Sequence, residues 1–148
     1  MTLVRALRMA VKEKEKNFEK IPRPSSPQPE HLRLGRDGED AACDYLKSIG
    51  YVILDRNVSY RCGEIDIIAR DDDEIVFAEV RTRSVGKITP PETTVGPNKL
   101  SKLIKSARIW TESANYCGFW RIDLVAVTSE NGKLCKIEHI KNITEGIW

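Results

Sequence analysis

The stretch from Gly63 to Arg83, GEIDIIARDDDEIVFAEVRTR, constrains the fold more than any other part of the chain. It contains two apolar runs with strand-like alternation, joined by the short polar tract Asp71 to Asp73. Because this tract is too short for anything but a hairpin connection, the two runs are predicted to be antiparallel neighbours in one sheet.

Charged side chains lie at two-residue spacing in each run and therefore share one face. Glu64 and Asp66 point the same way on the first strand, as do Glu79 and Arg81 on the second. A loop of two or four residues places Asp66 opposite Glu79 and Glu64 opposite Arg81, whereas a loop of three slips this register by one. The other face is assigned to the apolar residues Ile65, Ile67, Val76, Ala78 and Val80.

Two carboxylates that face each other across a sheet repel, at a cost of roughly 0.2–1 kcal/mol when exposed and more when buried. A cation removes this cost, and Mg²⁺ commonly binds one or two carboxylates while it keeps several waters for a phosphate-containing substrate. The alternative is an amphipathic hairpin with a solvated charged face, in which Glu64 and Arg81 form an ion pair worth under about 1 kcal/mol.

Length and composition limit the class of protein. The 148 residues are 41% hydrophobic and 31% charged, which is typical of a globular protein with one core. No run approaches a membrane span, and Arg5 and Arg8 interrupt the N-terminal region before a secretory signal can form. We therefore expect a cytoplasmic protein without membrane association. Free buried thiols are expected in preference to a zinc site or disulfides, because no paired spacing joins Cys43, Cys62, Cys117 and Cys135.

Residues 1–30 are predicted to form a basic, flexible tail and linker, since four prolines occur in the ten residues IPRPSSPQPE. A transient contact with nucleic acid or a partner is the functional alternative for this tail. The folded domain is expected to span residues 31–148. The net charge of +2 does not by itself indicate nucleic acid, because positive charge must be clustered to matter.

Two helices are predicted from helical spacing of apolar residues. The first runs from Leu34 to Ile49, with Gly50 at the C-cap. Glu39 lies on its apolar stripe, which indicates either a site role or a first-turn acid favoured by the helix dipole. The second runs from Asn98 to Asn115 and carries a basic side that is also typical of a solvated surface helix: Lys99, Lys102, Lys105 and Arg108.

Further strands are predicted at 51–55 and 120–128, with 134–140 as a candidate fifth strand, and the loose segment 84–96 is expected to cross over the sheet. The order is therefore α-β-β-β-α-β, a mixed central sheet flanked by helices, in the α/β (α+β) class.

Four strings of the chain resemble the YraN-like uncharacterised protein family: LGRDGEDAA at 34–42, GEIDIIARD at 63–71, FAEVRTR at 77–83 and RIDLVAV at 121–127. The resemblance covers about residues 31 to 145. That family is similar in core topology to the PD-(D/E)XK nuclease superfamily, which includes restriction endonucleases and Holliday junction resolvases. The resemblance implies a restriction-endonuclease-like core, in agreement with the predicted order of elements.

By this resemblance, Asp66 and Glu79 bind Mg²⁺ or Mn²⁺, and Glu39 corresponds to a helix acid that contacts metal or water. Arg81 stands in the place of the catalytic lysine; arginine stays protonated and can supply only charge and hydrogen bonds. The implied activity is metal-dependent endonucleolytic hydrolysis of phosphodiester bonds in DNA, with branched or damaged DNA as candidate substrates. Resolvase-like action on a symmetrical junction would imply a homodimer.

Lys99, Lys102 and Arg83 are predicted to contact the nucleic acid. Lys99 is also a candidate substitute for the missing lysine, against the alternative of an ordinary surface side chain. Asp123 is interpreted as a buried structural acid bonded to backbone, Arg83 or Arg121. Two other functions stay open: a nucleic-acid-binding module of nuclease fold with weak or no catalysis, and a partner-binding domain unrelated to nucleic acid.

Overall fold

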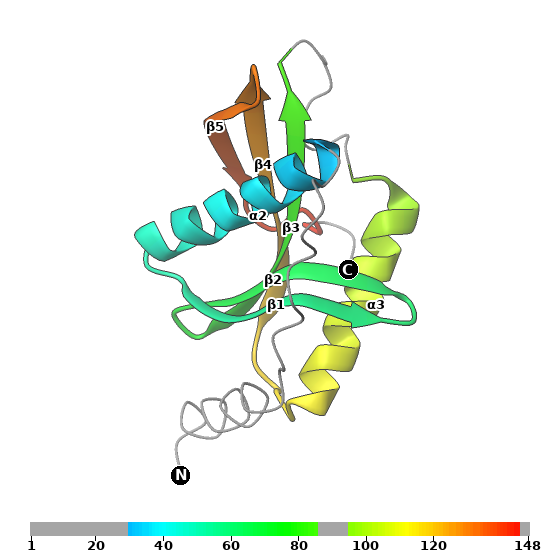
Figure 1. Cartoon of the computed structure of the whole chain (residues 1–148). Helices are drawn as coiled ribbons and strands as arrows, with labels where there is room; N and C mark the ends of the chain where they lie inside the picture. Colours follow the sequence, from blue (N-terminus) through cyan, green and yellow to red (C-terminus); the bar gives the residue numbers. More distant parts are fainter. Residues whose placement is uncertain (1–29, 86–94, 146–148) are drawn as a thin grey trace, which may run out of the picture.

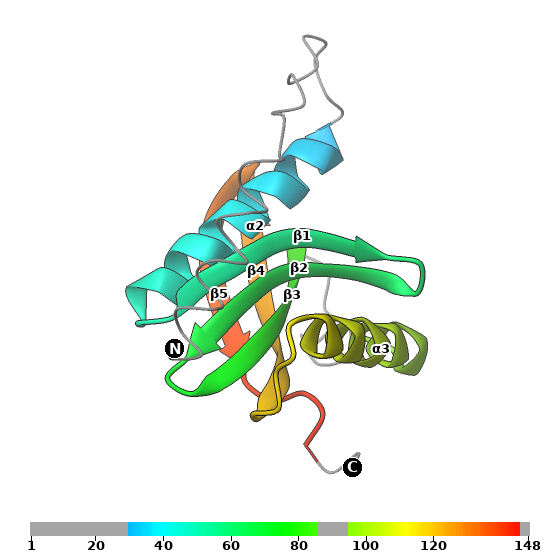
Figure 2. The ribbon, with the colours of Figure 1, turned by 90° about the horizontal axis from the view of Figure 1, so that it is seen from below.

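The computed structural model describes residues 30–85 and 95–145, with side chains from residue 33 onward. Two helices lie on opposite faces of one five-stranded sheet (Figures 1 and 2). The elements follow the order α2 (Glu30–Ser48), β1 (Val52–Tyr60), β2 (Gly63–Asp71), β3 (Glu74–Ser84), α3 (Pro97–Ser113), β4 (Trp120–Glu130) and β5 (Lys133–Ile140). This confirms the predicted fold class. Residues 1–29 of the predicted tail and most of the crossover segment lie outside the described residues, whereas Glu30, the last residue of that tail, begins α2.

The strands lie side by side in chain order, from β1 to β5. β3 and β4 are parallel, with α3 in the connection between them, and every other neighbouring pair is antiparallel. The β2–β3 ladder runs from Ile67–Ala78 to Asp71–Glu74 and leaves a two-residue turn, in which Asp72 has a φ of 50°. This is the predicted register, but the ladder ends at Ile67–Ala78, one pair before the predicted pairing of Asp66 with Glu79.

The two apolar clusters of the core lie on either side of the sheet. Leu46 of α2 packs with Ile67, Val76, Ala78 and Val125 on one face. On the other face the α3 cluster contains Leu103, Ala107 and Trp110 with Phe77 and Ile122. Both helices therefore bury most of the apolar stripes that their sequences predict, but Ile49, which lies just past the end of α2, is exposed. Gly50 follows α2 with a φ of 98°, a left-handed conformation that glycine adopts without strain.

β2 parts from β3 immediately beyond Ile67 and Ala78, because from there β2 pairs only with β1. The free part of the β1–β2 hairpin curves over α3 (Figure 2). Asn57, which stands opposite Asp66, has a φ of 52° and interrupts the β1–β2 ladder. The prediction that Ile65 shares a face with Ile67 is therefore wrong: Ile65 packs in the α3 cluster.

The cysteines are free, as predicted, but only Cys43 is buried. Cys62 is half-buried, and Cys117 and Cys135 are exposed. The prediction of burial is wrong for the last two because Cys117 lies in the α3–β4 connection and Cys135 on the edge strand β5. Neither helix of the described part is long and apolar enough to cross a membrane.

Gly38 allows α2 to approach β3 closely. A Cβ at this position would lie 1.9 Å from Oγ1 and 3.1 Å from Cβ of Thr82. Rotation of Thr82 cannot clear its own Cβ, so we expect Gly38→Ala to lower the free energy of unfolding by about 1–3 kcal/mol. Gly35→Ala in the same helix meets nothing within 4 Å and should instead be neutral or stabilising by up to about 1 kcal/mol. Urea denaturation measures both changes, and equal effects would contradict the close approach.

Candidate functional site

Asp66 is half-buried where β2 parts from β3. Its Oδ2 accepts a hydrogen bond of 2.7 Å from the backbone N–H of Val80, so the side chain crosses the gap between the separating strands. Burial raises the pKa of Asp66 above its ordinary value; the hydrogen bond from Val80 and the charge of Lys99 only partly offset this effect.

The carboxylate of Glu79 lies between two cations. Its side chain is 3% exposed, with Nε of Arg81 at 3.1 Å from Oε1 and Nζ of Lys99 at 3.2 Å from Oε2. These two contacts are ion pairs that lack hydrogen-bond geometry. Oε2 of Glu79 and Nε of Arg81 are therefore both buried without a hydrogen-bond partner among the described residues. Burial and then the charge of Asp66 raise the pKa of Glu79 to about 7, despite the two cations.

Glu39 of α2 is half-buried and lies close enough to Asp66 for the two charges to interact. Burial raises its pKa, and the charge of Asp66 raises it further. Across residues 30–85 and 95–145, however, no three His, Cys, Asp or Glu side chains are arranged to hold a metal ion. The structure thus brings Asp66 and Glu79 together and places Glu39 close by, but a direct metal contact by Glu39 stays a prediction.

The donor set at Asp66 and Glu79 fits a hard divalent cation. Mg²⁺ prefers oxygen ligands and usually takes one or two carboxylates, with waters and substrate phosphate oxygens in the remaining positions. Oε2 of Glu79 is a buried acceptor with no hydrogen bond in the described part of the chain, and it can serve as such a ligand once Nζ of Lys99, at 3.2 Å, moves aside. The charge of Asp66 raises the pKa of Glu79, and a cation bound between the two acids would offset this repulsion.

The three residues predicted to contact nucleic acid do not all lie at this site. Lys99, in the first turn of α3, reaches Glu79. Lys102 is exposed one turn further along, beside the start of β2 at Gly63. Arg83 instead lies 3.4 Å from Glu138 of β5, two strands away from β3, so its part in nucleic-acid binding stays a prediction.

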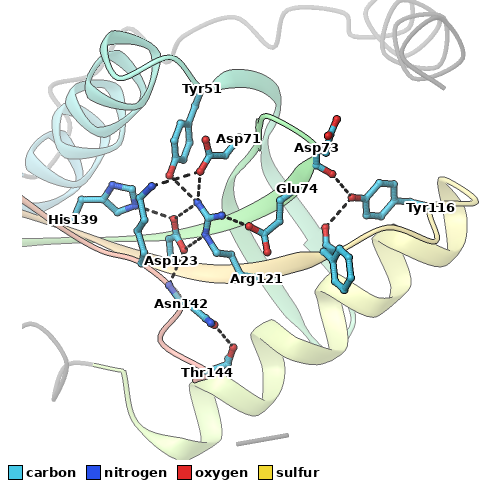
Figure 3. Close-up of polar contacts among 12 residues, drawn as sticks. Tyr51, Asp71, Asp73, Glu74, Tyr116, Arg121, Asp123, His139, Asn142 and Thr144 are labelled. Atoms are coloured by element: carbon cyan, nitrogen blue, oxygen red, sulfur yellow. Dashed lines mark hydrogen bonds and ion pairs between the residues drawn. The ribbon is translucent and has the colours of Figure 1, made fainter. Parts of the chain in front are cut away.

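A second charged network, centred on Arg121, lies at the hairpin end of the sheet (Figure 3). The guanidinium donates to Asp71 and to the hydroxyl of Tyr51, both at 2.7 Å, to Asp123 at 2.9 Å, and to Glu74. It connects the β2–β3 turn to β4 and, through Tyr51, to the connection between α2 and β1.

Asp123 is fully buried in this network, as predicted for a structural acid, with Arg121 rather than Arg83 as its partner. It also accepts hydrogen bonds from the backbone N–H of Asn142 at 2.9 Å and contacts Nε2 of His139 at 2.8 Å. Asp123 pairs with Ala78 and shares a face of the sheet with Val125, and both of these residues belong to the apolar cluster that packs against α2. Glu79 instead shares the α3 face with Phe77. Asp123 therefore lies on the opposite face from Glu79 and outside the candidate site. Sequence reasoning missed the partners Tyr51, Asp71, Glu74 and His139.

The raised pKa of Glu79 predicts a pH dependence for the metal-free protein. Because folding raises this pKa from 4.5 to about 7, the folded state holds the proton more tightly. The resulting stabilisation is full below pH 4.5 and is lost as pH rises through 7. We expect a loss of up to about 3 kcal/mol across this window. Urea denaturation in EDTA at several pH values measures it; Glu79→Gln should flatten the slope, and an unchanged slope would count against the raised pKa.

A mixed sheet flanked by two helices, with paired buried carboxylates where two strands separate, defines an α+β protein consistent with a nuclease-like core. The chain belongs to the Uncharacterised protein family UPF0102, whose model matches residues 38–127. This confirms the YraN-like family, and the match includes both acids of the candidate site.

Relatives in this family resemble most of the chain. A UPF0102 protein of Pseudarthrobacter chlorophenolicus is 39% identical over 115 residues, which are 76% of this chain and 86% of the relative. One from Geotalea uraniireducens is 38% identical over 122 residues, covering 82% and 96% of the two chains. One from Syntrophus aciditrophicus is 42% identical over 117 residues, covering 78% and 91%.

Proposed function

We propose that the protein is a metal-dependent endonuclease that hydrolyses phosphodiester bonds in DNA. The observation that carries this proposal is the pair Asp66 and Glu79, two carboxylates gathered where β2 and β3 separate. The pKa of Glu79 stays raised although Arg81 and Lys99 contact its carboxylate, so a divalent cation would offset the repulsion that these side chains leave, and the oxygen-only donor set suits Mg²⁺ or Mn²⁺.

A divalent ion bound there supplies Lewis-acid polarisation of the phosphate and a water of lowered pKa. The chain's own residues orient the acids. The N–H of Val80 fixes Oδ2 of Asp66, and the buried β3 backbone holds Glu79. Arg81 is half-exposed beside Glu79 and always protonated, so it can bind a phosphate oxygen but cannot remove a proton from water.

Cleavage of linear, flapped and four-way DNA by the full chain, in millimolar Mg²⁺ or Mn²⁺, tests the proposal. We expect at least one of these forms to be cut only when metal is present. Cleavage that persists in EDTA, or intact DNA in every form with both metals, would refute the endonuclease.

A nucleic-acid-binding module without catalysis is the second candidate, and the two cations that cover Glu79 favour it. In that case the same substrates remain intact but are bound, with a log affinity that falls by about 0.9 per phosphate contact for each log unit of salt. Whether Arg81 can take over the role of the catalytic lysine therefore decides between an endonuclease and a nucleic-acid-binding module without catalysis.

A further inference from the structure

Lys99 occupies an electrostatically unfavourable place in α3. It is the third residue of the helix, where the positive end of the helix dipole repels cations, and no acidic residue lies in this first turn. The contact of its Nζ with Oε2 of Glu79, at 3.2 Å, crosses from α3 to β3 and compensates for this position. Lys99 is thus held at the site by the carboxylate that the proposed metal would use.

Both oxygens of Glu79 are covered by cations of the chain, so a metal must displace one of them. Arg81 is the less suited to leave, because it lies two residues along the same strand as Glu79, so the β3 backbone itself keeps its guanidinium beside Oε1. Lys99 has a flexible four-carbon stem and a side chain that is 34% exposed, so its ammonium can move into water.

We infer that Lys99 is an internal counterion that occupies the metal-binding oxygen of Glu79 and is displaced when a divalent cation binds. This inference rests on the proposed metal site. In the metal-free protein, Lys99 offsets the charge of the two acids. When the cation takes Oε2, the ammonium is released at the N-terminus of α3, beside the acids, where it can contact a phosphate oxygen of the substrate. Lys99 and the metal therefore compete for one atom.

Competition predicts that neutralising Lys99 strengthens metal binding. Isothermal titration of the metal-free full chain with Mn²⁺ should give a dissociation constant about 3- to 10-fold lower for Lys99→Gln than for the unmodified chain. Lys99→Met should show the same gain, which excludes the added amide oxygen as a ligand. Lys105→Gln is the charge-matched control. Lys105 is exposed and about 9 Å further along the helix, where salt screens its charge, so its effect should stay below about 2-fold.

The outcomes separate this inference from the proposed function. Mn²⁺ binding by the unmodified chain with no gain in either Lys99 variant would overturn the counterion role and leave the metal site standing. An equal gain in Lys105→Gln would also overturn it, since general charge would then explain the effect. Binding by the Lys99 variants alone would support it in its strongest form. No binding by any variant at millimolar Mn²⁺ would overturn the metal site and the inference together.

Discussion

Asp66→Asn is expected to reduce metal-dependent DNA cleavage by at least about 100-fold. A bound divalent cation contributes several kcal/mol to the stabilisation of transition-state charge, and each 1.36 kcal/mol corresponds to a factor of ten in rate. Asn keeps the side-chain carbonyl oxygen that can accept the hydrogen bond from Val80, but it lacks the negative charge that attracts the metal. The loss should appear in single-turnover cleavage at saturating protein.

The stability of the same variant distinguishes a lost site from a lost fold. Removing the charge of Asp66 should leave the metal-free melting temperature unchanged or higher, because burial disfavours charge at Asp66 and the charge of Asp66 in turn disfavours charge at Glu79. Glu64→Gln is the matched control: Glu64 is on the same strand, exposed and two residues away, and its cleavage rate should stay within about 3-fold. Cleavage by Asp66→Asn at the unmodified rate would remove Asp66 from the mechanism.

The hairpin and its acid pair could be predicted because their determinants are local. Side-chain alternation assigns the faces of each strand, and the two-residue turn after Asp71 fixes the register, which places Asp66 and Glu79 one step beyond the last pair, Ile67–Ala78. The face of Ile65 could not be predicted, since alternation fails where Asn57 adopts a left-handed conformation and the hairpin bends over α3.

The contacts that complete the site depend on how distant elements dock. Lys99 reaches Glu79 only because α3 follows a crossover and starts beside β3, and sequence spacing does not give that position. The same holds for Arg121, whose partners Asp71 and Tyr51 lie 50 and 70 positions earlier in the chain. One local signal was present: Arg121 and Asp123 stand at strand spacing within a buried apolar run, as Glu79 and Arg81 do.

The Arg121 network is expected to determine stability rather than chemistry, and Asp123→Ala should lower the free energy of unfolding at pH 7 by about 3–5 kcal/mol. The substitution leaves the backbone N–H of Asn142 without its acceptor and removes the fully buried counter-charge of Arg121. Because total stability is about 5–15 kcal/mol, this change should be visible as a large shift of the urea midpoint.

The direction of the pH effect identifies the network as the cause. Burial by itself would raise the pKa of Asp123, but hydrogen bonds from His139, Asn142 and Arg121 outweigh burial and lower it below 3.8. The stabilisation by Asp123 is therefore present above pH 3.8 and is lost in acid, opposite to the direction for Glu79. The deficit of Asp123→Ala should shrink below that pH. The double variant Arg121→Met with Asp123→Leu should recover part of the lost stability, because an apolar pair leaves no buried charge uncompensated. A loss of less than about 1 kcal/mol in the free energy of unfolding for Asp123→Ala alone would contradict the stabilising role of the network.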